Sequence, residues 1–165
     1  MKIRTIQSHY QAVLPTPFGC IGIVLANEKL HGIDFLPADY LLQAPDSPLA
    51  HRVAAALNQY FDDPGSSFDL PLAILGTAHQ VKVWRALTAI PPGHTTTYGQ
   101  LAHFLDSSPR AVGQACGANP LPIIIPCHRV VAANGRGGFM HQVSGAPLTY
   151  KDWLLRHESR ITAGA

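Results

Sequence analysis

Apolar positions in the first half of the chain follow the period of a β-strand. Residues 8–37 are rich in β-branched side chains and alternate apolar with polar or small residues, with a polar turn at 27–29. This pattern is typical of strands. Apolar residues then recur at helical spacing across 49–61, and Ser47 precedes them as a candidate N-cap. Residues 1–72 are therefore predicted to form a small α/β domain.

Residues 73–165 show helical spacing for most of their length, which predicts a mostly helical C-terminal domain in a chain of the α/β class. A helix is predicted over 77–90, where Pro-Pro-Gly stops it, and a last amphipathic helix over 148–158. Between them lie two short predicted helices, 99–105 and 109–117, joined by three polar residues. Such a pair is a helix-turn-helix candidate. The second helix of the pair is rich in alanine and glycine, so it can pack closely against another helix or a DNA groove.

Composition places the chain among globular proteins. Hydrophobic residues make up 47% and charged residues 13% of its 165 positions. No apolar run approaches the ~18 residues of a membrane span, and the first residues contain no apolar signal-peptide core. Three cysteines, an odd number, argue against a disulfide framework and fit a reducing compartment. A cytoplasmic protein without a membrane partner is expected.

The sequence contains no metal-binding pattern, and its charge distribution gives only a weak indication of a polyanion partner. No Cys-x-x-Cys pair and no His or Cys/His cluster has zinc spacing, so neither a metal nor a cofactor is expected. Residues 1–76 carry four basic and seven acidic side chains, a net charge of −3. Residues 77–165 carry eight basic and three acidic side chains, a net charge of +5. A polyanion would prefer the C-terminal half, although chance asymmetry explains the same numbers.

The candidate chemistry centres on Cys127. The apolar run 123–125 and Pro126 lead into it, which predicts a buried, stiff strand that presents the thiol. His128 follows directly, and a neighbouring base favours the reactive thiolate. Adjacent strand residues point to opposite faces, so contact between the two side chains requires a bend or a helix start after Cys127. Taken alone, the dipeptide favours a buried structural cysteine beside an ordinary histidine.

The wider pattern reverses that preference. The segment 119–131, with its Pro-Cys-His-Arg-Val core, resembles the active-site segment of the O6-alkylguanine-DNA alkyltransferases, also called methylated-DNA–protein-cysteine methyltransferases. Four further segments resemble parts of the same family in the same order: 76–84, 90–102, 109–113 and 151–158. The N-terminal half is compatible with the family's small, ribonuclease H-like α/β domain.

The resemblance implies a DNA repair activity. Cys127 would take the alkyl group of O6-alkylguanine in double-stranded DNA irreversibly, after the base has flipped out of the helix. His128 would take the thiol proton through a water, and Glu158 would orient His128. Asn119 would brace the segment before the cysteine. The resemblance implies no cofactor, and a monomer that acts once.

Five further residues have roles implied by the resemblance. Tyr98 would help to rotate the nucleotide and donate a hydrogen bond to the base, and the backbone carbonyl of Val130 would read the exocyclic amine. Arg110 would enter the duplex in the vacated space. The small residues Ala111 and Gly113 would let their helix enter the minor groove. The alternative for Tyr98 is an ordinary core tyrosine, and the alternative for Arg110 is a solvated charge on a helix surface.

The loop after the cysteine departs from the family pattern. Family members usually carry a Gly-Tyr-Ala-Gly-Gly-like stretch that closes over the substrate oxygen, whereas 138–147 lacks the tyrosine and the paired glycines that follow it. Ser144, or else Gly145, is expected to supply the missing substrate contact, and Arg129 a DNA contact. The departure motivates one alternative function, a lesion-binding protein with weak or absent transfer. A cysteine hydrolase that uses Cys127 and His128 is a second alternative.

Overall fold

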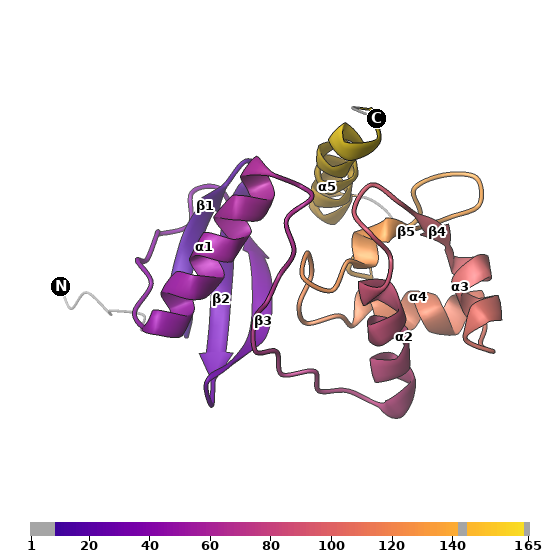
Figure 1. The fold of residues 1–165 in the computed structure, drawn as a ribbon, viewed down its shortest axis with the longest axis horizontal. Helices are drawn as coiled ribbons and strands as arrows, with labels where there is room; N and C mark the ends of the chain where they lie inside the picture. The colour runs from indigo at the N-terminus through magenta and orange to yellow at the C-terminus, as the bar shows by residue number, and fades with distance from the viewer. Residues whose placement is uncertain (1–8, 142–144, 164–165) are drawn as a thin grey trace. The chain divides into compact units, whose positions relative to one another are not determined.

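The computed structural model describes residues 9–141 and 145–163 (Figure 1). Over these ranges the chain is a mixed α/β protein, so the predicted fold class is confirmed. It forms two compact units, each with its own packing, and the chain passes between them more than once. The two units are therefore joined by more than one segment of the chain.

The first unit holds the residues up to Asn58 together with Asp69–Ala73. The second holds Gln59–Phe68 and the residues from Ile74 onward. A short stretch that follows the first unit in sequence therefore belongs to the second.

The first unit is built on a three-stranded antiparallel sheet in the order β1-β2-β3. Its strands are β1 (Ala12–Thr16), β2 (Gly19–Ala26) and β3 (Lys29–Leu36). The turn between β2 and β3 consists of Asn27 and Glu28, with φ angles of 51° and 61°. Two consecutive left-handed residues are the geometry of a tight hairpin turn, so the predicted strands and turn are confirmed.

Helix α1 (Pro48–Asp62) lies along this sheet (Figure 1). The Ser47 hydroxyl accepts a hydrogen bond from the Ala50 amide at 3.1 Å, which is the N-cap that the sequence predicts. The helix buries an apolar stripe that includes Ala50, Val53 and Leu57. Its last turn belongs to the second unit.

Three helices with side-chain caps organise the second unit: α2 (Ala78–Thr88), α3 (Tyr98–Phe104) and α4 (Pro109–Gly117). Reciprocal capping boxes begin the first two, and a serine cap with proline at N1 begins the third. The Trp84 indole on α2 donates a hydrogen bond to the Ala115 carbonyl on α4 at 2.8 Å. All three helices agree with the prediction to within two residues at each end.

A short parallel pairing joins the chain before α3 to the chain after the cysteine. Strand β4 (Thr96–Thr97) pairs with β5 (Val130–Val131). Tyr98 follows β4 directly, and the 3₁₀ turn η1 (Cys127–Arg129) precedes β5. The pairing therefore brings the start of α3 beside the cysteine segment, and α5 (Ala146–Ala163) closes the unit.

The predicted buried strand over 123–125 is wrong. These residues form turns; Ile123 has a φ of 74°, and the Ile125 amide donates to the Leu121 carbonyl at 2.8 Å. Three prolines within 119–126 lack backbone donors, so the segment cannot complete a strand ladder. Its apolar side chains are buried in a compact turn instead.

Candidate active site

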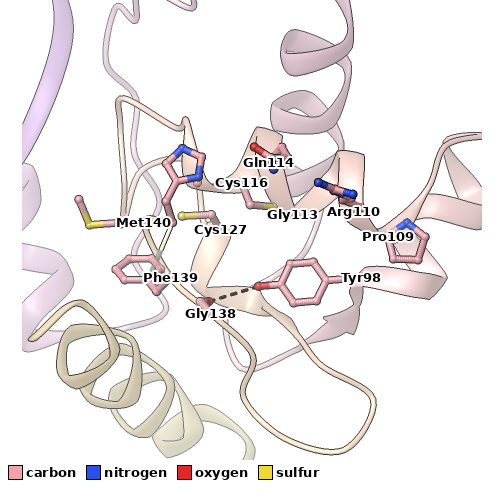
Figure 2. Close-up of a pocket in the computed structure, with 12 residues that line it drawn as sticks. Tyr98, Pro109, Arg110, Gly113, Gln114, Cys116, Cys127, Gly138, Phe139 and Met140 are labelled. Carbon is pink, nitrogen blue, oxygen red and sulfur yellow. Dashed lines mark hydrogen bonds between the residues drawn. The ribbon is translucent and has the colours of Figure 1, made fainter. Parts of the chain in front are cut away.

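A cavity of about 380 Å³ lies beside α3, α4, η1 and the loop before α5 (Figure 2). Its lining residues are Tyr98, Pro109, Arg110, Gly113, Gln114, Cys116, Gly117, Cys127, Gly138, Phe139, Met140 and His141. The volume falls in the range of small-molecule sites, and a few polar groups converge on a largely apolar wall. The cavity therefore suits a single small, partly polar molecule, such as one nucleobase.

Cys127 lines this cavity at the first residue of η1, where the helix start required by the sequence is present. Its side chain is 3% exposed. Burial raises the pKa of the thiol to about 11, although a hydrogen bond from Asn119 and the charge of Lys151 oppose the rise. The thiol is therefore neutral at pH 7 and needs a base before it can act as a nucleophile.

Asn119 holds the turn that precedes the cysteine. Its side-chain Nδ2 donates to the Ile125 carbonyl at 2.8 Å, and its Oδ1 accepts from the Leu121 amide at 2.9 Å. Both bonds are buried, and the same side chain reaches the Cys127 thiol. These contacts span the turn for which the sequence predicts a bracing role of Asn119, and that role stays a prediction.

His128 and Glu158 are paired within the protein core. The Nε2 of His128 lies 2.7 Å from Oε1 of Glu158, and both side chains are almost completely buried. Burial lowers the pKa of His128 and outweighs the opposing pull of Glu158. Since an ionised carboxylate can only accept, Nε2 carries the proton of the neutral ring. Nδ1 is then the basic nitrogen, and it has no hydrogen-bond partner among the described protein groups.

Arg129 completes the surroundings of Glu158. Its Nε donates to Oε2 at 3.0 Å and its Nη2 to Oε1 at 2.8 Å, while Nη1 donates to the Ile90 carbonyl at 2.6 Å. Burial alone would raise the pKa of Glu158, but the hydrogen bonds from His128 and Arg129 outweigh it and hold the pKa far below its usual range. The expected DNA contact of Arg129 is not supported, because its guanidinium is buried on this carboxylate.

Lys151 is a charged residue that the sequence reasoning missed. It is fully buried on α5 and donates to the carbonyls of Val130 and Gly138, both at 2.7 Å. Burial lowers the pKa of its amine to about 8. The amine faces the Tyr98 ring at 5.8 Å from the ring centre. Lys151 therefore ties the strand after Cys127 to the loop that closes the cavity.

Tyr98 and Val130 are two expected substrate contacts, and both lie near Lys151. The Tyr98 hydroxyl donates to the Gly138 carbonyl at 3.2 Å, and burial raises the pKa of the phenol to about 12. Tyr98 therefore remains a proton donor at neutral pH. The Val130 carbonyl accepts from Lys151, and Val130 does not line the cavity. Ser144, the other expected substrate contact, lies outside the described residues.

Helix α4 lines the cavity along its whole length, from Pro109 to Gly117. Arg110 is exposed at the second position of the helix and lines the cavity mouth, and Gly113 lines the wall nearby. Ala111 is half-buried and lines a neighbouring hollow. A Cβ atom at Gly117 would overlap the ring of His141, so glycine is required where that loop meets the helix. The structure brings Tyr98, Arg110 and Gly113 together with Cys127.

Two more residues near the site escaped the sequence reasoning. Cys116 lines the same cavity as Cys127, and burial raises the pKa of its thiol to about 12. Tyr60, from α1, donates its hydroxyl proton to Glu158 at 2.8 Å. Helical periodicity places both residues on buried faces, but it carries no signal for the partner they meet.

Within residues 9–141 and 145–163, no three His, Cys, Asp or Glu side chains gather where they could hold a metal ion. In the same ranges, no helix combines the length and the hydropathy that a bilayer crossing requires.

The fold and the site together define a protein class. A cysteine at the wall of a small cavity is followed in sequence by a buried histidine that pairs with a carboxylate, residue types that suit a nucleophile, a base and an orienting group. Two short capped helices flank the cavity and expose an arginine at its mouth. This combination is typical of the class of proteins that act through a cysteine nucleophile.

Comparisons with known proteins identify the family. The family model described as "6-O-methylguanine DNA methyltransferase, DNA binding domain" matches residues 78–160. A methylated-DNA–protein-cysteine methyltransferase of Methanosarcina acetivorans is 37% identical over 156 residues, which cover 90% of this chain and 97% of that protein. The chain therefore belongs to the 6-O-methylguanine DNA methyltransferase family, and the resemblance found in the sequence is confirmed.

Solved structures agree over nearly the whole chain. The O6-methylguanine methyltransferase of Mycobacterium tuberculosis superposes with a TM-score of 0.77 at 32% identity, covering 92% of this chain and 93% of that one. The OGT protein of the same organism, in complex with DNA, gives a TM-score of 0.75 at 31% identity, covering 90% and 91%.

Proposed function

We propose that this chain repairs DNA by moving the alkyl group of O6-alkylguanine in double-stranded DNA onto Cys127. The observation that carries the proposal is the position of the Cys127 thiol, at the wall of a nucleobase-sized cavity and next in sequence to the buried His128–Glu158 pair. The family named by the comparisons acts on methylated DNA through a cysteine. A DNA substrate also agrees with the net charge of +5 on residues 77–165.

The reaction begins with loss of the thiol proton. Because the pKa of Cys127 is about 11, only about one thiol in ten thousand is ionised at pH 7. The basic Nδ1 of His128 takes the proton through a water, and Glu158 stabilises the ring as it becomes charged. The neutral thiol is a weak nucleophile until His128 takes its proton.

Transfer then exchanges one bond for another. The sulfur attacks the alkyl carbon, a carbon–sulfur bond forms, and the bond between that carbon and O6 breaks. The electron pair stays on the guanine, where a hydrogen bond from the Tyr98 hydroxyl stabilises the developing charge, and the proton held by His128 returns to the guanine through solvent. The resulting thioether is stable, so each molecule acts once.

DNA would approach over α4. The alkylated carbon is inaccessible in a stacked duplex, so the base must flip, which costs a few kcal/mol. Arg110 lies at the cavity mouth and would fill the gap in the stack, while Ala111 and Gly113 keep the helix thin enough for the minor groove. The lesion-specific partner is therefore duplex DNA that contains O6-alkylguanine.

Mass spectrometry tests the proposal directly. A duplex with one O6-methylguanine should add the mass of one methylene group to the protein, confined to the peptide that holds Cys127. Cys127→Ala should bind the duplex and gain no mass. Cys116→Ala is the matched control, because it removes the other thiol of the same cavity and should leave the mass gain on Cys127. A gain on Cys116, or none in the wild type, would contradict the proposal.

The lesion-binding alternative rests on the loop that holds Phe139, Met140 and His141 where relatives carry tyrosine and glycines. The intact thiol, base and carboxylate oppose it. Tight binding of the methylated duplex without a mass gain would favour this alternative, and repeated turnover of an acyl ester would favour the cysteine hydrolase.

Five finer features remain proposals. The helix-turn-helix is supported by the α3–α4 pair, joined through Asp106 with a φ of 53°. The ribonuclease H-like character of residues 1–72 is supported by the antiparallel sheet with its helix. A boundary near residue 73 agrees with the end of the first unit at Ala73, whereas Gln59–Phe68 belong to the second unit. We also propose that the protein is a monomer, which light scattering can measure. A cytoplasmic location is proposed too, and free thiols at all three cysteines support it.

A further inference from the structure

Tyr60 shares an oxygen atom with the histidine of the active site. Its hydroxyl donates to Oε1 of Glu158 at 2.8 Å, and the same Oε1 lies 2.7 Å from Nε2 of His128. Tyr60 is completely buried. Burial and the charge of Glu158 raise the pKa of the phenol, so the hydroxyl stays protonated and acts as a donor. The phenol therefore contacts the group that orients the base, although it does not line the cavity.

Tyr60 is held in place at both ends of the residue. Its backbone carbonyl lies 2.6 Å from Nε2 of His157, the residue next to Glu158. The Tyr60 ring meets the His157 ring edge-on at 5.2 Å and packs against Phe68 at 5.6 Å. The His157 ring in turn stacks on Trp153 at 4.6 Å. Consecutive residues of α5 thus grip the backbone and the hydroxyl of Tyr60, so the donor has a fixed direction.

We propose that Tyr60 is a positioning residue for alkyl transfer. By donating to Oε1, it keeps the Glu158 carboxylate turned toward His128 and lowers the effective charge on that oxygen. Among the residues that the structure describes, Glu158 otherwise accepts only from His128 and Arg129. Hydrogen-bond partners behind a catalytic group commonly fix its orientation and its basicity. This role rests on the proposed function, because it concerns the base that activates Cys127.

Loss of the Tyr60 hydroxyl should raise the pKa of His128, because it changes the charge on Glu158. The other charged groups that act on His128 are Arg129 and Lys151, which both lower the pKa of its imidazole and are present in wild type and variant alike. Without the phenol, the Glu158 carboxylate keeps more negative charge for His128, and a stronger negative neighbour raises the pKa of the imidazole. More of His128 is then protonated at mildly acidic pH, and a protonated ring cannot take the thiol proton. Removing the hydroxyl should therefore slow transfer most at low pH and least at high pH.

The position of Tyr60 in the chain adds a consequence. The family model begins at residue 78, whereas Tyr60 lies in the last turn of α1, the helix that starts in the first unit. The segment 78–160 holds the thiol, the base and the carboxylate but lacks this donor. The N-terminal part of the chain thus contributes a residue to the chemistry as well as to the fold.

The test compares Tyr60→Phe with Tyr10→Phe. Tyr10 is the matched control, since its hydroxyl donates to Asp34 at the same distance of 2.8 Å and does not reach the cavity. Single-turnover transfer from a duplex with O6-methylguanine is measured with protein in excess, from pH 5.5 to 9, together with the affinity for the duplex. Tyr60→Phe should transfer about tenfold more slowly at pH 6. The loss should shrink toward pH 9, with the affinity unchanged. Tyr10→Phe should follow the wild type.

Three outcomes would overturn the proposal: an unchanged rate, an equal loss at every pH, or the same loss in Tyr10→Phe. If Tyr60→Phe fails to fold, 3-fluorotyrosine at position 60 keeps the ring and makes the donor more acidic. The acidic limb of the pH profile must then move to lower pH, and an unmoved limb would overturn the proposal. Absence of transfer by the wild type would instead refute the proposed function, so the two failures are distinguishable.

Discussion

Replacing Glu158 with glutamine should destabilise the second unit by about 3–5 kcal/mol, the usual cost of removing one partner from a buried ion pair. The Glu158 side chain is 1% exposed and accepts from Arg129 at 3.0 and 2.8 Å. Glutamine keeps the shape but offers only one acceptor oxygen, and its amide donor faces a guanidinium that also donates. The charge of Arg129, which is 7% exposed, would then lie buried without a counter-ion.

Urea denaturation followed by tryptophan fluorescence measures this loss. Both tryptophans, Trp84 and Trp153, belong to the second unit, so the signal reports the unit that contains Glu158. Asp152→Asn is the matched control, a carboxylate-to-amide change on the same helix that breaks the half-exposed ion pair with Arg136. This control should lose less than about 1 kcal/mol. A loss below about 1 kcal/mol in Glu158→Gln would refute the reasoning.

The pH dependence gives the same prediction a second check. The pKa of Glu158 is lower in the folded protein than its ordinary value of 4.5, so the folded state favours the ionised form. Its contribution to stability is complete above pH 4.5 and declines as the pH falls toward the folded pKa. The difference between wild type and Glu158→Gln should therefore narrow below pH 4.5. A constant difference down to pH 3 would show that charge is not the cause.

Three further outcomes are expected. Alkylation of Cys127 by iodoacetamide, followed by peptide mass spectrometry, should rise about a hundredfold from pH 7 to 9 without a plateau, because the thiol pKa is about 11; a plateau below pH 8 would contradict this. Asn119→Ala should lose about 2–4 kcal/mol in urea denaturation, since two buried hydrogen-bond partners are left unsatisfied; a loss under about 0.5 kcal/mol would count against it. Met140→Gly should enlarge the cavity and relieve a left-handed φ of 51°, which should raise transfer of a benzyl group relative to methyl about tenfold; an unchanged ratio of the two rates would exclude Met140 as a size filter.

The local elements could be read from the sequence because their signals are local. Thr77, Thr97 and Ser108 cap their own helices through residues three positions on, and Asn27 turns the hairpin in which it lies. Such contacts involve neighbours in the chain, so spacing and residue type suffice. The same holds for the choice of Cys127 as the acceptor, where a contiguous motif carries the information.

The tertiary structure decided what surrounds that motif. The run before Cys127 looks like a strand, yet it becomes a turn because Asn119 and three prolines leave no ladder to join. Arg129 looks like a DNA contact, yet it is buried against Glu158.

The tertiary structure also decided the contacts between residues that lie far apart in the chain. Tyr60 meets Glu158 across 98 residues, and Lys151 meets Val130 across 21. No periodicity encodes contacts of this kind, because they depend on how separate elements pack. The sequence alone therefore determined the family and pointed to Cys127 as the candidate acceptor, whereas the long-range contacts of Tyr60 and α5 decided how His128 is held.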